Sequence, residues 1–178
     1  MKKNNIMYLS IVICLLPIIL GIVFYDDLPN QMPIHFTIKD QVDNYANKNI
    51  ALFAIPIIMA IVQTICLIVN NNRLKEEKEP PILKILKWII PTLTVLIYLI
   101  MLLFSLGVDI WIGKSICLIL GILLLIVGNY LPKVSFAVGR HISHPAPKNE
   151  AVFKKTNKIM GYIFVGLGII FLLLIPFV

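Results

Sequence analysis

Long apolar runs recur along this chain and constrain its fold more than any other feature. A helix needs about 20 apolar residues to cross the hydrocarbon core of a bilayer. The chain offers five candidate spans of roughly this length, at residues 6–25, 50–69, 85–107, 115–131 and 159–178. Apolar residues make up 59% of the sequence and charged residues only 14%, too few to cover a soluble globule. Because the runs are continuously apolar, we expect an all-α polytopic membrane bundle of about five helices.

We expect a single integral membrane domain over residues 1–178. The longest loops hold about 25 residues, which is too few to bury an independent core. The first run is longer than the apolar core of a typical signal peptide, and no small-x-small cleavage site precedes the polar loop that follows it. We therefore interpret residues 6–25 as a retained membrane span.

Basic residues gather in alternate segments of the chain. The N-terminus and the loops after the second and fourth spans hold 13 of the 16 Lys and Arg residues. Because cytoplasmic loops carry an excess of basic residues, we expect the N-terminus inside and the C-terminus outside. The basic residues of the inner loops then lie near anionic lipids of the inner leaflet. This accounts for the formal net charge of +7 without a nucleic acid as a partner.

The predicted spans carry little chemistry. No ionisable residue lies near the middle of any span, which disfavours a proton relay or an ion-coupled transporter. The motifs of intramembrane catalysis are missing, so we do not expect an enzyme. A small transporter or efflux component remains an alternative. A membrane-bound enzyme is a second one, with His35 and Asp43, or His141 and His144, as its candidate reactive groups.

The polar loop between the first two spans is the best candidate for a binding site. Pro29 and Pro33 each hold the preceding residue extended, which predicts a stiff strap that keeps His35 and Phe36 close to the membrane surface. Such a strap suits the binding of a partner better than it suits catalysis.

A metal site in the same loop is a weaker alternative. The potential ligands are Asp26, Asp27, His35, Asp40 and Asp43. His and carboxylate groups bind divalent cations, but closeness in sequence does not make a coordination shell. We expect a solvated loop with no metal and no cofactor.

The basic segment from residue 128 to residue 161 is the second candidate site. Gly139 permits an unusual backbone turn, and Arg140 offers a planar fork for carboxylate or phosphate, with a lipid headgroup as the simplest partner. His141 and His144 have the spacing of a zinc pair, but the prolines that follow interrupt any helix there.

The spacing of glycines in the last two predicted spans indicates helix packing. Gly121 and Gly128, and likewise Gly161 and Gly168, recur seven residues apart, which places each pair on one helix face and allows close packing. Residues 148–158 look like an amphipathic helical entry to the last span.

Both candidate sites carry motifs that resemble known proteins. The polar loop, within residues 26–49, resembles the motif L-P-x-x-I-P-x-H-(F/W)-N-x-x-G-x-x-D of a bacterial membrane domain of unknown function. The matching positions are Leu28, Pro29, Pro33, His35, Phe36, Asp43 and Lys48. The basic segment, within residues 115–178, resembles the SdpI-type immunity proteins. The matching positions are Gly128, Asn129, Pro132, Lys133, Gly139, Arg140, Asn149, Glu150, Val152, Phe153, Lys155, Asn157, Lys158 and Gly161.

The chain departs from these motifs at a few positions. Asp40 stands where the loop motif has Gly, Thr37 replaces Asn, and Phe153 replaces Trp. The specificity for a ligand can therefore differ from that of the relatives.

The resemblance implies a multi-pass protein of the bacterial cytoplasmic membrane that gives resistance to a secreted toxic peptide. Some relatives also capture a cytoplasmic repressor when the toxin is present. The expected outer contacts are Pro29, Pro33, His35, Phe36, Asp43 and Lys48. The expected inner positions, a repressor dock or a lipid anchor, are Gly128, Asn129, Gly139, Arg140, Asn149, Lys155 and Gly161. The expected partners are the toxic peptide, membrane lipids and, in the sensing case, the repressor.

Overall fold

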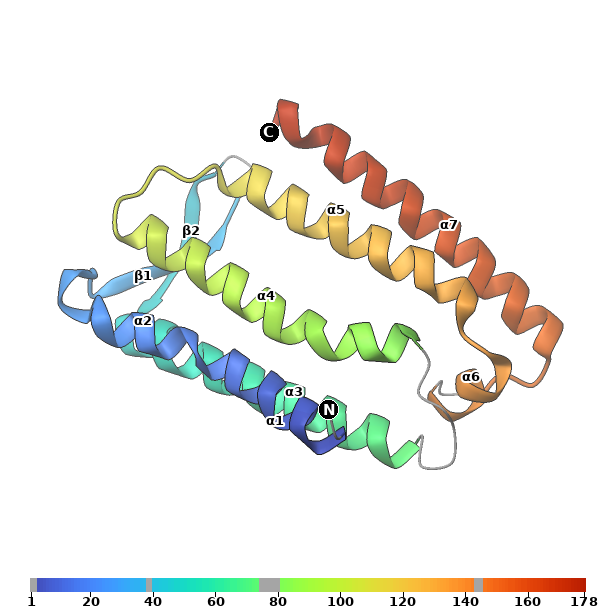
Figure 1. The fold of residues 1–178 in the computed structure, drawn as a ribbon. Helices are drawn as coiled ribbons and strands as arrows, with labels where there is room; N and C mark the ends of the chain where they lie inside the picture. The colour runs from blue at the N-terminus through green and yellow to red at the C-terminus, as the bar shows by residue number, and fades with distance from the viewer. Residues whose placement is uncertain (1–2, 38–39, 74–80, 143–145) are drawn as a thin grey trace. The chain divides into compact units, whose positions relative to one another are not determined.

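The computed structural model describes all residues except 1–2, 38–39, 74–80 and 143–145, and it is mostly helical (Figure 1). The α-helices are α1 (Lys3–Leu15), α2 (Pro17–Val23), α3 (Ile55–Arg73), α4 (Pro81–Ser105), α5 (Ile112–Tyr130), α6 (Phe136–Ile142) and α7 (Glu150–Leu174). Shorter helical turns are η1 (Tyr25–Asp27), η2 (Ile50–Ala54, a π-helix), η3 (Leu131–Lys133) and η4 (Ile175–Phe177). The strands are β1 (Gln31–Phe36) and β2 (Val42–Asn47).

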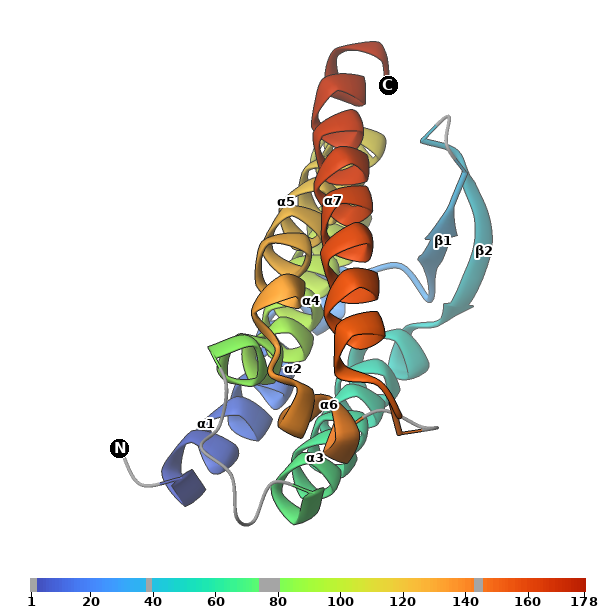
Figure 2. The ribbon, with the colours of Figure 1, turned by 90° about the vertical axis from the view of Figure 1, so that its right-hand side faces the viewer.

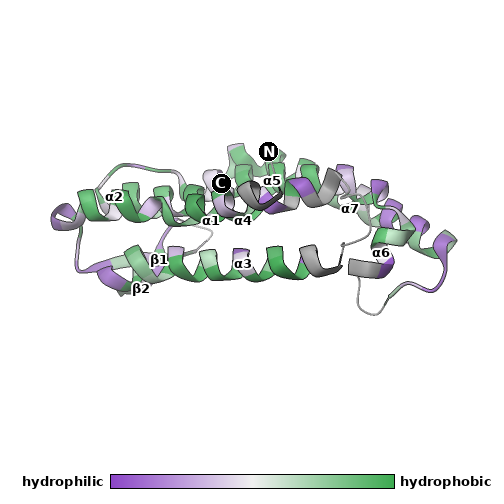
Figure 3. Ribbon diagram, turned by 60° about the horizontal axis from the view of Figure 1, so that its bottom comes forward, coloured by the Kyte–Doolittle hydropathy of each residue, from purple (hydrophilic) through white to green (hydrophobic). Residues whose placement is uncertain are grey.

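Four helical segments in the described part of the chain are long and apolar enough to cross a membrane. They are Ile50–Asn70, Lys87–Ser105, Ile112–Lys133 and Glu150–Phe177. No more than 28% of the most apolar window of any of them is buried, so most of their apolar side chains face outward, as in helices surrounded by lipid. Figure 3 shows these helices as mostly hydrophobic ribbons, with hydrophilic residues gathered near their ends. The expectation of a multi-pass membrane protein is confirmed at this level.

The first predicted span, residues 6–25, is not one continuous helix. Its apolar helical stretch, Met7–Val23, is shorter than the four spans and is divided between α1 and α2. The division falls at Pro17, which begins α2 and has no N–H to continue the hydrogen bonding of the preceding turn. The count of five spans and the side of each terminus therefore stay predictions.

The expectation of a purely helical fold is wrong in the polar loop. Residues 31–47 form an antiparallel β-hairpin, in which Gln31 pairs with Asn47 and Phe36 with Val42. The predicted extended conformation around Pro33 is confirmed, because this residue lies within β1. The strap pairs with a second extended stretch that follows it, β2. Figure 2 shows β2 leading into the helical segment that η2 begins and α3 continues.

The described residues form two compact units, and the prediction of a single domain stays a prediction. Unit 1 comprises residues 1–67 and 87–115, and unit 2 comprises residues 68–86 and 116–178. The core of unit 1 combines the hairpin with residues of η2 and α4. Its buried members are Leu28, Met32, Ala51, Leu52, Tyr98, Met101 and Leu102.

A buried polar contact joins three helices of unit 1. The Gln63 side-chain amide on α3 donates to the Ser10 hydroxyl on α1 at 3.0 Å and to the Lys87 carbonyl on α4 at 2.8 Å. Gln63 and Ser10 are fully buried, and the Lys87 side chain is largely buried as well. Buried polar groups need such partners, so this contact links α1, α3 and α4 in the interior of unit 1.

Candidate functional site

The hairpin, residues 31–47, is held against the end of α4 by two apolar side chains of β1. Met32 is fully buried in the core of unit 1 beside Tyr98 and Leu102. The Phe36 ring packs edge-on against the Phe104 ring, with centroids 5.1 Å apart. Phe36 was expected to contact a ligand, but the structure places it partly buried against α4, where it fastens the hairpin.

Lys48 fastens the other end of the hairpin. Its ammonium group donates to the carbonyls of Tyr25 and Leu28, at 3.0 and 3.1 Å, and lies 4.2 Å from the centroid of the Tyr25 ring. The Tyr25 hydroxyl in turn donates to the side chain of Asn49 at 2.7 Å. Since these contacts are internal, Lys48 holds η1 to the base of β2, and its contact with a ligand stays a prediction.

The tip of the hairpin contains a backbone conformation that sequence reasoning could have found. Asp40 has a φ of +58°, in the left-handed region where the related motif has Gly. The Asp40 carboxylate accepts a hydrogen bond from the Gly113 backbone N–H, in the first turn of α5. Because the first N–H groups of a helix lack partners within the helix, this contact caps α5. The Gly of the motif was a usable signal for this turn, but nothing in the sequence indicated the cap.

His35 and Asp43 come together as the hairpin closes. The Nδ1 atom of His35 lies 2.6 Å from the Asp43 carboxylate, and both side chains are exposed, at 68% and 43%. An exposed pair of this kind contributes little to stability. The pair instead presents one imidazole and one carboxylate, side by side, on a hairpin that is packed against α4.

The remaining predicted residues of the loop have different surroundings. Pro29 is exposed, whereas Pro33 is buried in β1 opposite Tyr45. Tyr45 and Ile34 are large apolar residues that are 54% and 41% exposed. The sequence did not single out these two, of which Tyr45 lies two residues from Asp43 on β2 and therefore on the same face of that strand.

No group of three or more metal-binding side chains occurs in the described part of the chain. The five potential ligands of the polar loop are therefore not gathered, because Asp40 caps α5 while Asp43 pairs with His35. In the basic segment, His144 lies outside the described residues, and the side chain of His141 is not described either.

The predicted close packing of the glycine pairs is confirmed in unit 2. A methyl group added at Gly128 would lie 2.8 Å from the Gly161 carbonyl oxygen, and one added at Gly168 would lie 2.9 Å from the Gly121 carbonyl oxygen. These four residues let the backbones of α5 and α7 approach closely. Gly128 and Gly161 are accordingly packing positions.

Gly139 is a packing position as well, although it was expected to permit an unusual turn. It lies within α6, where an added methyl group would overlap the ring of Phe153. The Phe153 ring also packs edge-on against Phe136, with centroids 5.8 Å apart. The residue that replaces the Trp of related proteins therefore joins α6 to α7.

The polar residues of the basic segment lie at helix ends. Asn149 caps α7, because its side chain accepts from the Val152 N–H at 3.1 Å. The Asn129 side chain accepts from the Lys133 ammonium at 3.3 Å. Arg140 and Lys155 are exposed and have no hydrogen bond or ion pair to any other described residue. Of the predicted inner positions, these two are the ones available to an external partner.

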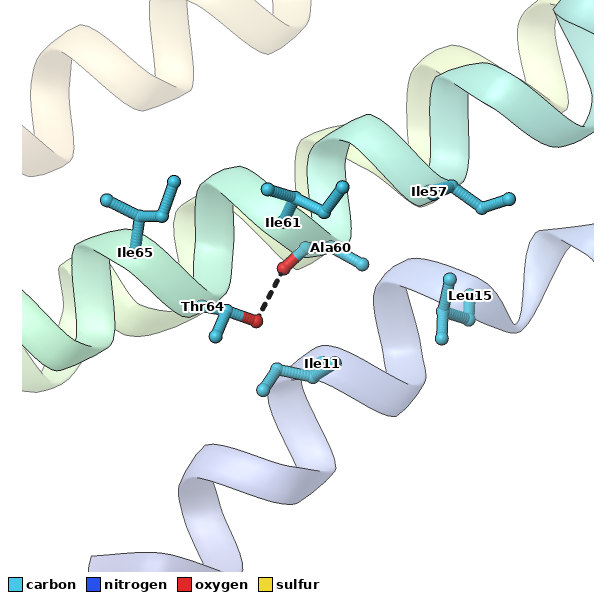
Figure 4. Close-up of a pocket in the computed structure, with 7 residues that line it drawn as sticks. All are labelled: Ile11, Leu15, Ile57, Ala60, Ile61, Thr64 and Ile65. Atoms are coloured by element: carbon cyan, nitrogen blue, oxygen red, sulfur yellow. Dashed lines mark hydrogen bonds between the residues drawn. The ribbon is translucent and has the colours of Figure 1, made fainter.

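A shallow apolar groove of about 400 Å³ lies between α1 and α3 (Figure 4). Its lining residues are Ile11, Leu15, Ile57, Ala60, Ile61, Thr64 and Ile65. The one polar side chain among them, Thr64, donates to the Ala60 carbonyl at 2.7 Å. A surface of this composition suits a lipid chain and offers no group for specific recognition.

Comparison with known proteins gives one match. Residues 12–60, which include α2, the hairpin and η2, match a family described as a domain of unknown function (DUF1648). The match covers less than a third of the chain. No curated protein matches, and no solved structure matches. The chain is therefore similar to this domain in the part that contains the hairpin, and the likeness carries no specific activity.

Proposed function

We propose that this chain is a membrane immunity protein that protects a bacterial cell from a secreted toxic peptide. The resemblance of residues 128–161 to the SdpI-type proteins supports this role, together with that of residues 28–48 to a bacterial membrane domain of unknown function. The structural observation that carries the proposal is the rigid hairpin. Met32, Phe36 and Lys48 hold it in place, while the His35–Asp43 pair remains exposed for recognition.

The proposed setting is the cytoplasmic membrane, with the N-terminus inside and the hairpin on the outer face. The bias of Lys and Arg toward alternate segments supports this orientation. A toxic peptide arriving from outside then meets the hairpin before it reaches the bilayer. The proposed role is binding, and it includes no chemical step.

Arg140 and Lys155 have a separate role in this proposal. They are exposed cations at the ends of helices, and on the inner face they would lie close to anionic headgroups. We assign them to lipid contact, with capture of a cytoplasmic repressor as the further role that the resemblance implies. A repressor dock would make these two residues necessary for signalling but not for protection.

The test is the survival of a sensitive bacterial strain that expresses the chain and is challenged with a panel of membrane-active peptides. Selective protection from one peptide supports the proposal. The double variant His35→Ala/Asp43→Ala should lose this protection. The matched control is Glu150→Ala/Lys154→Ala, which removes another exposed ion pair, 2.7 Å long, from the start of α7. If both double variants protect equally, the hairpin is not the recognition surface.

A small transporter is the second candidate, and the buried polar contact in unit 1 favours it. The Gln63 side chain lies within the Ile50–Asn70 span, is 1% exposed, and donates to the buried Ser10 hydroxyl at 3.0 Å. Polar groups inside a membrane protein often mark a substrate path. Uptake or efflux by sealed vesicles, lost in Gln63→Leu, would favour transport over immunity.

A further inference from the structure

The outer edge of β2 is open in the described part of the chain. The sheet has two strands, and β2 pairs with β1 alone. Side chains of β1 reach into the core of unit 1, whereas Asp43, Asn44, Tyr45 and Asn47 of β2 are all exposed. An open edge carries unpaired N–H and C=O groups, and proteins usually protect it with Pro, Lys or a bulge.

The two edges are protected differently: β1 carries Pro33, whereas β2 has one irregularity in pairing, at Asp43, and pairs regularly with β1 from Tyr45 to Asn47. Hydrogen-bonded and non-hydrogen-bonded pairs alternate along an antiparallel ladder. The Lys48 N–H donates to the Asn30 carbonyl at 2.9 Å, so the pair of Pro33 with Tyr45, three residues further along, is non-hydrogen-bonded. Pro33 therefore removes a donor from the free edge of β1. On β2, in contrast, the Tyr45 N–H points away from β1, toward the open edge, and the strand contains neither Pro nor Lys.

Acidic side chains occur within β2 and in the segment that joins its base. Asp26 and Asp27 are exposed on η1, which Lys48 joins to the base of β2, and Asp43 lies within the strand. Residues 26–48 hold four Asp and two Lys, and one of these Lys, Lys48, points its ammonium group at backbone carbonyls. Asp109 is exposed on the connection between α4 and α5, just before the turn of α5 that Asp40 contacts through Gly113. The surface beside the open edge therefore favours positive charge.

We propose that β2 accepts a segment of a cationic peptide as a third strand of the sheet. The inference rests on the proposed function, and it names both the charge of the peptide and its manner of binding. Backbone hydrogen bonds to β2 supply affinity without requiring one sequence, as in other cases of strand addition. The Asp side chains select a peptide that carries Lys or Arg, and the exposed Tyr45 contacts its apolar residues.

A second copy of this chain is a poorer occupant of the same edge. Pairing β2 with β2 would bring two acidic surfaces together, and like charges facing each other across strands are unfavourable. A cationic peptide instead gains from the same charges. Addition of a strand to β2 also needs no movement of β1, because β1 stays fastened through Met32 and Phe36.

The experiment measures binding of a probe peptide to the full chain in nanodiscs of zwitterionic lipid. The probe is a decapeptide of alternating Lys and Val. Two further versions carry N-methyl groups on every Lys or on every Val. In an added strand, only one of these two sets of N–H groups faces β2. We expect one methylated version to lose binding at least tenfold and the other to bind within threefold of the parent.

Variants of the protein test whether the backbone of β2 forms hydrogen bonds with the peptide. Tyr45→Pro removes the N–H that points toward the open edge, and Tyr45→Ala removes the side chain but keeps the N–H. We expect Tyr45→Pro to weaken binding about tenfold more than Tyr45→Ala does, as for the loss of one hydrogen bond. Equal losses in the two methylated probes, binding to empty nanodiscs alone, or crosslinking of two copies through β2 would each overturn strand addition.

The outcome also separates this inference from the proposed function. If Tyr45→Pro loses the probe but still protects cells from a toxic peptide, strand addition stands and the immunity role of this surface fails. If His35→Ala/Asp43→Ala loses protection while neither methylated probe discriminates, the immunity role stands and strand addition fails.

Discussion

The packing of α5 against α7 gives the sharpest prediction, because α7 contains both a contacting and a non-contacting glycine. A methyl group added at Gly161 would lie 2.7 Å from the Gly128 carbonyl oxygen and 2.7 Å from a carbon of the Pro132 ring. One added at Gly166 would meet nothing within 4 Å. Gly161→Ala should therefore force the two helices apart, and Gly166→Ala should not.

The magnitude follows from comparing the two variants. Both replace Gly by Ala within a helix and gain a similar improvement in helix propensity, which cancels in the difference. Overpacking a well-packed site costs about 1–3 kcal/mol, and here one of the two obstructing atoms belongs to the backbone. We expect the free energy of unfolding of Gly161→Ala to lie below that of Gly166→Ala by this amount.

The assay is reversible unfolding by SDS in mixed micelles, followed by far-ultraviolet circular dichroism. Gly128→Ala should behave like Gly161→Ala. The double variant should lose less than the sum of the two, because one separation of the helices relieves both contacts. Equal stability of Gly161→Ala and Gly166→Ala, within about 0.5 kcal/mol, would refute the packing through glycine.

Three further predictions concern the hairpin and are measured by its rate of cleavage by a protease in detergent. Met32→Ala should lower the free energy of local unfolding of the hairpin by about 2–5 kcal/mol, because Met32 is fully buried. Ile34→Ala should change this free energy by less than about 0.5 kcal/mol. Equal effects of the two variants would mean that the hairpin is not packed on α4. Lys48→Met should lower the free energy of local unfolding of the hairpin by about 1–3 kcal/mol, because two hydrogen bonds to carbonyls are lost. Lys48→Arg should lower it by less, since arginine keeps a donor. Asp40→Ala should be more destabilising than Asp40→Gly, because both lose the bond to Gly113 but only alanine keeps the unfavourable positive φ; the reverse order would show that the positive φ costs nothing.

Local features of the fold were predictable because each depends on residues that are close in sequence. Continuous apolar runs predicted the four long helices, and the spacing of Gly121 and Gly128 predicted one packed helix face. Proline restricts the backbone of its own and the preceding residue, so the extended conformation around Pro33 followed as well.

The roles of the site residues depended on contacts between distant parts of the chain. Phe36 and Lys48 carry the same motif as His35, yet they fasten the hairpin to α4 and η1, whereas His35 remains exposed with Asp43. Asp40 caps a helix that begins about 70 residues later in the chain. A motif records which residue types occur together but not which of them face the protein interior. That division arises only when the helices pack, because burial and hydrogen bonding with distant partners determine which side chains stay free to meet a ligand.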